Sequence, residues 1–264
     1  MLVNKITEII DMRSIRAVSA LILREMISTY GRHVGGYAWA IIEPIAALAL
    51  LSIVFSIAFR APALGDNFPL FYATGYLPFM LYNDVSTKVA QSIKFSKPLL
   101  FYPPVTFAHA ILGRFILNIM THCLIFLIII VSITQLFDYR APLNFIPMLN
   151  AISMAAALAI GVGTLNCYAS TRFLVWDRLW AILNRPAFIV SGIFFIPSSV
   201  PEPYRTYLFY NPLIHVVGEM RTGFYPSYVG NYISWIYVYL FAITCFLLGL
   251  ILLSRYHRLL LNSY

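Results

Sequence analysis

The chain alternates between long apolar stretches and short charged ones. No formal charge occurs in residues 115–137, 141–171 or 223–254, and each stretch exceeds the roughly 20 residues that a helix needs to cross a bilayer. In hydrocarbon the backbone must satisfy its own hydrogen bonds, so these stretches are expected to be helical. The pattern therefore predicts an all-α, polytopic membrane protein.

Six membrane-spanning helices are predicted. The second and fifth are less uniformly apolar than the others, because Pro78 and Asp84 interrupt the second and Arg185 and Pro186 interrupt the fifth. The predicted spans cover residues 37–59, 69–90, 115–137, 146–168, 179–197 and 233–253.

Composition and charge place these spans in a membrane and orient them. The chain is 61% hydrophobic and 11% charged, against roughly 25% charged residues in a soluble domain. Of its 18 Lys and Arg residues, fourteen fall in the N-terminal segment, the second and fourth connections and the C-terminus. By the positive-inside rule both termini are predicted to be cytoplasmic. The net charge of +8 then marks a cytoplasmic membrane face, and no nucleic-acid partner is expected.

The N-terminal segment, residues 1–34, has the pattern of an amphipathic helix at the cytoplasmic interface. Its residues Ile15, Val18, Ile22 and Met26 share an arc of about 80° at helical spacing. Such a helix would lie with its apolar face in lipid and its arginines among the headgroups. Two roles remain open for it: simple anchoring, or guidance of an anionic substrate by arginine side chains, namely those of Arg24 and Arg32.

Glu43 is a carboxylate inside the first predicted span. It lies about six residues, or roughly 9 Å, from the start of that span, which is near the headgroups. A charge there costs less than one at the bilayer centre. Structural pairing with a basic residue of its own segment and a direct contact with substrate are the two interpretations of Glu43.

Two cytoplasmic connections combine apolar, aromatic and basic residues. One runs over residues 88–108 and contains LLFYPPVTF, and the other, STRFLVWDRLW, interleaves Phe173, Trp176 and Trp180 with charges. Exposed surface this apolar is typical of a docking site, so a protein partner is expected on this side.

The connection between the fifth and sixth spans predicts a re-entrant or interfacial helical segment. Four prolines from Pro197 to Pro212 preclude one continuous helix, while residues 207–217 are nearly all apolar or aromatic. Its tyrosines suit a headgroup belt or a contact with sugar rings. His215, Glu219 and Arg221 share one helical side, a spacing that also permits a local ion pair.

Several motifs are missing from the sequence. It has no G-x-x-x-x-G-K-[ST] phosphate loop and no H-E-x-x-H metal motif, and its three cysteines are isolated from one another. We therefore expect no metal site, no bound cofactor and no catalytic residues in this chain.

With these features, the chain resembles the permease subunit of type-2 ABC exporters, in the branch that exports capsular polysaccharide from Gram-negative bacteria. The resemblance covers most of the chain. It is carried by REMISTYGRHVGGYAWAIIEP near the N-terminus, GYLPFMLYNDVS in the second span and, most specifically, IFFIPSSVPEPYRTYLFYNPLIHVVGEMR before the sixth.

The resemblance implies a transport subunit of the inner membrane and not an enzyme. Two copies would form the pore, and two separate ATPase subunits, holding ATP and Mg, would dock beneath. The implied divisions are an interface helix at 1–34, the transmembrane domain at 35–257 and a cytoplasmic tail at 258–264. The residues expected to couple the ATPase are Lys94, Lys97, Tyr102, Arg172, Trp176, Asp177 and Arg178.

The implied substrate is a lipid-linked polysaccharide that enters laterally between the first and fifth spans. It would leave past the re-entrant segment toward a periplasmic co-polymerase or export adaptor. The residues expected at the gate and along the path are Arg24, Arg32, Tyr37, Glu43, Tyr207, Tyr210 and His215.

Alternative functions remain open from the sequence. The cargo of the same exporter class is alternatively a lipid-linked O-antigen or a teichoic polymer. An alternative of another class is a membrane-embedded transferase acting on lipid-linked substrates, which would need clustered acids or histidines that the sequence does not show.

Overall fold

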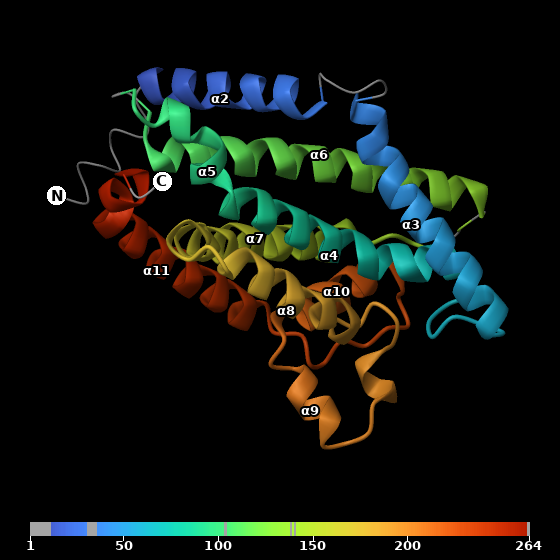
Figure 1. Ribbon diagram of the computed structural model, residues 1–264. Helices are drawn as coiled ribbons and strands as arrows, with labels where there is room; N and C mark the ends of the chain where they lie inside the picture. Colours follow the sequence, from blue (N-terminus) through green and yellow to red (C-terminus); the bar gives the residue numbers. More distant parts are fainter. Residues whose placement is uncertain (1–11, 31–35, 103–104, 138, 140, 263–264) are drawn as a thin grey trace.

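The computed structural model describes residues 12–30, 36–102, 105–137, 139 and 141–262, with the side chains of 12, 13, 29, 30, 37 and 257–262 outside the description. Throughout these ranges the chain forms helices and no strands (Figure 1). The helices are α2 (Met12–Tyr30), α3 (Gly36–Ala58), α4 (Phe68–Ala90), α5 (Ser92–Ser96), η2 (Lys97–Leu99), α6 (Phe107–Leu136), α7 (Phe145–Arg172), α8 (Trp176–Val190), η3 (Pro197–Ser199), α9 (Tyr204–Leu208), α10 (Pro212–Phe224) and α11 (Trp235–Asn262).

Four of these helices are long and apolar enough to cross a membrane. They are α3 from Ala38 to Ala58, α6, α7, and α11 from Trp235 to Tyr256. They coincide with the first, third, fourth and sixth spans expected from the sequence. The all-helical class is therefore confirmed, and the described residues contain four candidate membrane-spanning helices.

The other two predicted spans correspond to α4 and α8. The bounds of α4 match the prediction, but Asp84 and Lys88 lower its apolar character. Helix α8 has 15 residues, about 22 Å, against a hydrocarbon core of about 30 Å. It starts before residue 179 and ends at Val190, because Gly192 turns the chain with a φ of 76°. The six-span count remains a prediction.

Helix α7 forms the centre of the bundle and packs between α4 and α11. Its glycines allow close approach: a Cβ on Gly161 would lie 2.3 Å from the carbonyl oxygen of Ala242, and one on Gly163 would lie 2.9 Å from that of Ser86. Small residues at such crossings are typical of membrane helix packing. Leu158 and Met154 are fully buried in this core.

Helix α2 lies along the first half of α6 (Figure 1), where Gly113 approaches Leu21. The face that α2 buries against α6 lies beside the predicted apolar arc, which is expected to face lipid. Leu21 and Glu25 are buried, whereas Ile15 is exposed and belongs to an exposed stripe with Leu23 and Ile27. Helix α6 supplies a charged partner, Arg114, for Glu25, and this side of α2 therefore faces inward.

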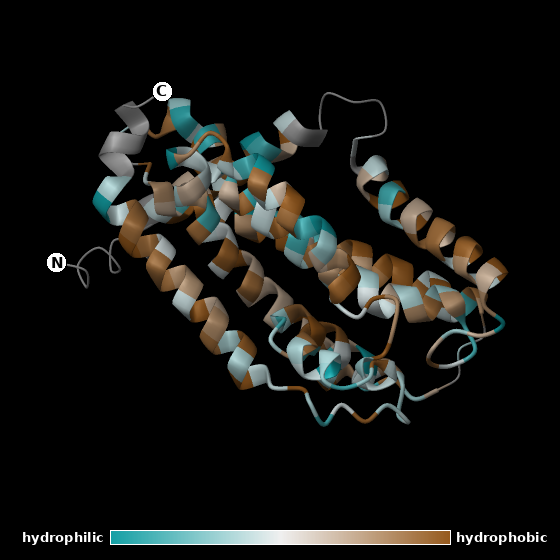
Figure 2. Cartoon of the chain, turned by 60° about the horizontal axis from the view of Figure 1, so that its bottom comes forward, coloured by the Kyte–Doolittle hydropathy of each residue, from teal (hydrophilic) through white to brown (hydrophobic). Residues whose placement is uncertain are grey.

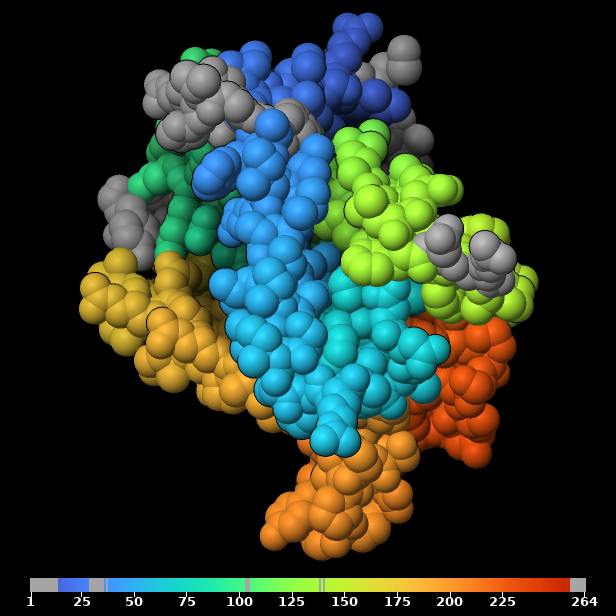
Figure 3. Space-filling view, turned by 90° about the vertical axis from the view of Figure 1, so that its right-hand side faces the viewer, coloured from blue at the N-terminus to red at the C-terminus, as the bar shows by residue number. Residues whose placement is uncertain are grey.

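Helices α3 and α8 are the most loosely packed of the long helices. Among the described side chains of α3 the buried ones are Pro44, Leu48 and Ser52, one stripe that faces α4, and α8 buries none. Figure 3 shows α3 in light blue and α8 in gold on the two sides of a recess.

The ends of the bundle differ in polarity. Figure 1 places the start of α2, α5, the start of α8 and the end of α11 at one end, and α9 protrudes at the other. Figure 2 shows the long helices largely brown, with teal residues gathered toward the end near α5. We call these the α5 end and the α9 end.

Candidate transport site

Two connections predicted as a docking surface meet at the α5 end. The Nζ atom of Lys94, in α5, donates to Oδ2 of Asp177, in α8, at 2.5 Å, and both side chains are partly exposed. An exposed ion pair contributes only about 0.2–1 kcal/mol to stability. The pair therefore sets the position of α8 relative to α5 without locking it.

The start of α8 is also anchored on α7 through its tryptophan. The indole N–H of Trp176 donates to Oδ1 of Asn166 at 2.9 Å, and its ring stacks on Trp180 with centroids 6.4 Å apart. Trp176 is half-buried as a result, so its polar edge is used within the chain and part of its ring faces outward.

An exposed surface with apolar and basic residues surrounds these contacts. Lys97 is half-buried in η2, whereas Tyr102, Arg172 and Arg178 are exposed. Four large apolar side chains are exposed as well, namely those of Phe101, Phe173, Leu174 and Val175. An apolar patch with basic residues at one end of a membrane bundle fits a cytoplasmic protein partner.

A buried ion pair, missed by sequence reasoning, joins α2 to α6. Nε of Arg114 lies 3.0 Å from Oε1 of Glu25, with 6% and 5% of the two side chains exposed. Arg114 also donates to the carbonyl of Lys88 at 2.8 Å and lies 4.1 Å from the Phe95 ring centroid. Burial raises the pKa of Glu25, and Arg114 opposes that shift. In the sequence, the only indication of this pair is that Glu25 and Arg114 each lie among apolar residues of a predicted helix.

The residues predicted at the inner gate are only partly described. Arg24 is half-buried and lies 5.2 Å from the Phe95 ring centroid. Glu43 is exposed on α3 and forms no ion pair with any basic side chain in the described ranges. The side chain of Tyr37 and the whole of Arg32 lie outside the described residues.

Of the residues predicted at the exit, the two tyrosines are exposed and the histidine is not. Tyr207 and Tyr210, in and after α9, are 67% and 71% exposed. His215 is buried: its Nδ1 accepts from the Ser234 N–H at 3.2 Å, so its Nε2 donates to the Phe209 carbonyl at 2.9 Å. His215 therefore ties α10 to the segments before and after it.

The local ion pair that the spacing of residues 215, 219 and 221 permits does not form. Glu219 accepts a hydrogen bond from Asn150 at 2.8 Å. Arg221 is fully buried and donates to the carbonyls of Phe195 and Ile193 at 3.0 and 3.1 Å. Its guanidinium also lies 4.4 Å from the Phe71 ring centroid. Arg221 thus donates hydrogen bonds to backbone carbonyls of the segment that follows the end of α8.

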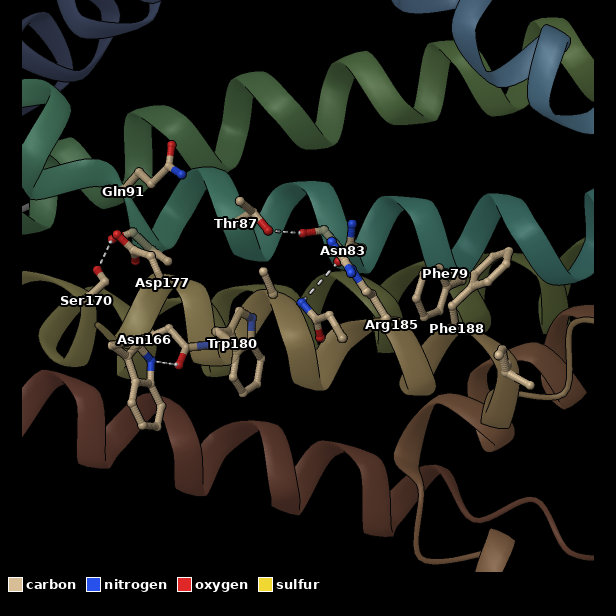
Figure 4. Close-up of a pocket in the computed structure, with 15 residues that line it drawn as sticks. Phe79, Asn83, Thr87, Gln91, Asn166, Ser170, Asp177, Trp180, Arg185 and Phe188 are labelled. Carbon is tan, nitrogen blue, oxygen red and sulfur yellow. Dashed lines mark hydrogen bonds between the residues drawn. The ribbon is translucent and has the colours of Figure 1, made fainter. Parts of the chain in front are cut away.

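A cavity of about 600 Å³ lies between α4, the end of α7 and α8 (Figure 4). Figure 4 shows Asn83 and Thr87 of α4 facing Trp180 and Arg185 of α8 across it. The side-chain amide of Asn184 donates to Oδ1 of Asn83 at 3.2 Å and links the two walls. The cavity borders the Lys94–Asp177 pair, since Asp177 is one of its lining residues.

Comparison with known proteins identifies the family. The model of the ABC-2 type transporter family matches residues 16–225, which is most of the chain. The chain belongs to this family. It is therefore a transport protein and not an enzyme.

Curated relatives match along nearly their full lengths. The polysialic acid transport protein KpsM of Escherichia coli is 28% identical over 246 residues, covering 93% of this chain and 95% of that protein. The capsule polysaccharide export inner-membrane protein CtrC of Neisseria meningitidis serogroup B is 27% identical over 244 residues, 92% of each chain. The capsule polysaccharide export inner-membrane protein BexB of Haemophilus influenzae is 26% identical over 245 residues, again 92% of each.

Proposed function

We propose that this chain is the permease subunit of an ATP-driven exporter that carries lipid-linked capsular polysaccharide across a bacterial inner membrane. The observation that carries the proposal is its similarity, over at least 92% of both chains, to capsule polysaccharide export proteins from two organisms and to a polysialic acid transport protein from a third. An embedded transferase is disfavoured by the same comparison.

The proposed topology has six spans, with α4 and α8 completing the four long apolar helices. In this topology α2 is the interface helix of segment 1–34, α9 and α10 form the re-entrant segment, and residues 258–264 are the tail. The burial of α4 in the centre of the bundle supports its place as a span. The α5 end, with Lys94, Arg172 and Arg178, is the cytoplasmic side, so both termini are cytoplasmic.

The proposed complex contains two copies of this chain and two ATPase subunits that bind ATP and Mg. The absence of a phosphate-binding loop from the sequence requires a partner for ATP hydrolysis. The exposed patch around the Lys94–Asp177 pair is the proposed docking surface, with Lys97, Tyr102, Arg172, Trp176 and Arg178 as further coupling residues.

The proposed substrate path begins at the recess between α3 and α8. Arg24, Arg32, Tyr37 and Glu43 belong to the inner end of this path in the proposal. Tyr207 and Tyr210 are available at the α9 end because both are exposed, and His215 acts there by holding α10 in place. A periplasmic co-polymerase or export adaptor receives the polymer.

The function is tested by deleting this chain in its own host and identifying the polymer that accumulates inside the cell. The proposal predicts intracellular capsular polysaccharide and none at the surface, with restoration by the intact chain. Accumulation of O-antigen or of a teichoic polymer instead would assign a different cargo, and normal surface capsule would contradict the proposal.

The inner end of the path is tested by reversing Arg24 and Arg32 to Glu. If they guide an anionic polymer, export falls while the amount of assembled complex is unchanged, and the matched control is Arg16→Glu on the exposed side of α2. Unchanged export with all variants would assign α2 to anchoring alone.

A further inference from the structure

Helix α8 buries none of its side chains, so polar contacts contribute strongly to its position. Side-chain hydrogen bonds hold its two ends, from the indole of Trp176 at the start and to the carbonyl of Val190 at the end. Among the described residues, the middle of α8 has one side-chain hydrogen bond to another helix. Asn184 donates it to Oδ1 of Asn83, in α4, at 3.2 Å (Figure 4). The Asn83 amide is therefore the polar group that holds the middle of α8.

The amide of Asn83 is oriented by a carboxylate. Its Nδ2 donates to Oδ1 of the neighbouring Asp84 at 3.2 Å. An ionised carboxylate only accepts hydrogen bonds, so the nitrogen of this amide has to face Asp84 and its oxygen is left to face Asn184. Without the carboxylate, the amide can turn about its last torsion and present either end to α8. Asp84 therefore selects the end of Asn83 that accepts from α8.

A histidine of α6 lies beside the same carboxylate. Nε2 of His122 is 3.6 Å from Oδ2 of Asp84, and 9% of the histidine side chain is exposed, against 36% for the aspartate. In the proposed topology α4 and α6 both cross the membrane, where an acidic side chain is rarely left without a partner. His122 and Asn83 thus each face one of the two oxygens of Asp84.

Together these side chains form a polar chain across three helices. The chain runs through His122 of α6, Asp84 and Asn83 of α4, and Asn184 of α8. It gives a place to Asp84, which interrupts the apolar pattern of the second predicted span. Asn83 and Asn184 also line the cavity between α4, α7 and α8, so their hydrogen bond sets the separation of two of its walls.

We propose that Asp84 and His122 are positioning residues that hold the middle of α8 against α4 by acting through Asn83. The histidine orients the carboxylate, the carboxylate orients the amide, and the amide accepts from Asn184. The consequence for transport rests on the proposed function, because the proposed substrate path begins at the recess between α3 and α8. In that path, the polar chain sets the width of the recess.

A spin label on α8 tests the proposal. Ile182 is 60% exposed and lies two residues before Asn184, so Ile182→Cys gives a labelling site on the middle of the helix. The matched reference is Leu127→Cys on α6, which is also 60% exposed. The three native cysteines are first replaced by Ala. The full-length chain is labelled and reconstituted in lipid nanodiscs, and its electron paramagnetic resonance spectrum gives the ratio of mobile to immobile label.

The largest change is expected for Asp84→Leu. It should raise the ratio of mobile to immobile label at residue 182 by about fivefold, the loss of roughly one hydrogen bond, and leave residue 127 unchanged. Asp84→Asn should be intermediate, because its amide can present either an oxygen or a nitrogen to Asn83. His122→Leu should act in the same direction, and His122→Gln, which keeps a nitrogen donor near the position of Nε2, should restore the wild-type ratio.

The action through Asn83 is tested by combining variants. Asn83→Ala removes the acceptor for Asn184, so adding Asp84→Leu to it should raise the ratio at residue 182 no further. A carboxylate that only stabilised the packing of α4 on α6 would instead add its own effect in the double variant.

Three results would overturn the inference: an unchanged ratio in Asp84→Leu, equal loosening at residues 127 and 182, or additive effects in the double variant. In a deletion strain, Asp84→Leu should restore less surface polysaccharide than the intact chain. Full restoration by a variant whose α8 is loosened would overturn the consequence for transport and leave the exporter standing. Normal surface polysaccharide in the deletion strain itself would instead contradict the proposed function.

Discussion

The two ends of α8 are held in different ways. At the α5 end, the exposed ion pair of Lys94 with Asp177 joins α8 to α5. At the α9 end, the fully buried Arg221 holds the segment that follows α8. The exposed pair is weak and can be broken and remade at small cost. The buried guanidinium donates hydrogen bonds to two backbone carbonyls, those of Phe195 and Ile193. The contrast indicates that the start of α8 is adjustable where the ATPase is proposed to dock, whereas the segment that follows the end of α8 is fixed.

Helix α2 adds a second fixed point beside the adjustable one. Glu25 and Arg114 are buried together, and the guanidinium groups of both Arg114 and Arg24 lie near the ring of Phe95 in α5. Since Lys94 and Phe95 are neighbours on α5, this short helix contacts α8 on one side and the α2–α6 pair on the other. Helix α5 therefore lies in contact with both α8 and the α2–α6 pair.

The largest effect is predicted for Glu25→Ala. Removing one partner of a buried ion pair leaves Arg114 buried and unpaired, which should cost about 3–5 kcal/mol of stability. Thermal unfolding of the detergent-solubilised chain measures the loss. Ile27→Ala, two residues away and 70% exposed, is the matched control and should stay within about 0.5 kcal/mol. Equal melting temperatures for the two variants would refute a buried pair.

The next effect is predicted for Arg221→Met. The substitution leaves the carbonyls of Ile193 and Phe195 without donors and should cost about 2–3 kcal/mol, partly offset by removal of a buried charge. Limited proteolysis should show faster cleavage near residues 191–200. Arg221→Lys keeps the charge without the fork and should be intermediate. Wild-type cleavage in Arg221→Met would show that the α9 end is not fixed by this residue.

A smaller effect on stability but a clear one on assembly is predicted for Trp176→Ala combined with Asp177→Ala. If the α5 end docks the ATPase, the ATPase retained on purification should fall by about tenfold, as expected for loss of a tryptophan anchor. Ile182→Ala, exposed further along α8, is the control. Unchanged retention and unchanged ATP-dependent export would remove both residues from the docking surface.

The smallest effect is predicted for exchanging the charges of Lys94 and Asp177. Lys94→Asp and Asp177→Lys should each lower stability by about 0.2–1 kcal/mol, and the double variant should recover most of it. A double-mutant cycle on thermal unfolding gives the coupling energy. Strictly additive single effects would mean that the pair contributes nothing to the position of α8.

The sequence predicted what depends on local pattern. Uncharged runs located α3, α6, α7 and α11, because lipid requires an apolar and internally bonded helix over a fixed length. It also located the segment that α9 and α10 form, since prolines bound it on both sides. Helix α8 ends at Val190, earlier than the predicted end of the fifth span at residue 197. The apolar pattern continues past Val190, but Gly192 adopts a left-handed conformation and ends the helix.

What depends on pairing between distant segments could not be predicted. Glu25 looked like one more charge on an interface helix, and its partner Arg114 is on another helix. Arg221 was placed with its own helix neighbours, whereas its acceptors are the carbonyls of Ile193 and Phe195. Lys94 and Asp177 were each assigned to the docking surface, but only the structure shows that they contact each other.

The most direct test of the account is transport by the purified components in proteoliposomes. The account predicts that radiolabelled lipid-linked polysaccharide becomes inaccessible to external enzymes only when this chain, its ATPase and ATP with Mg are all present, and that a catalytically inactive ATPase abolishes the signal. Transport that proceeds at the same rate without the ATPase would contradict the account.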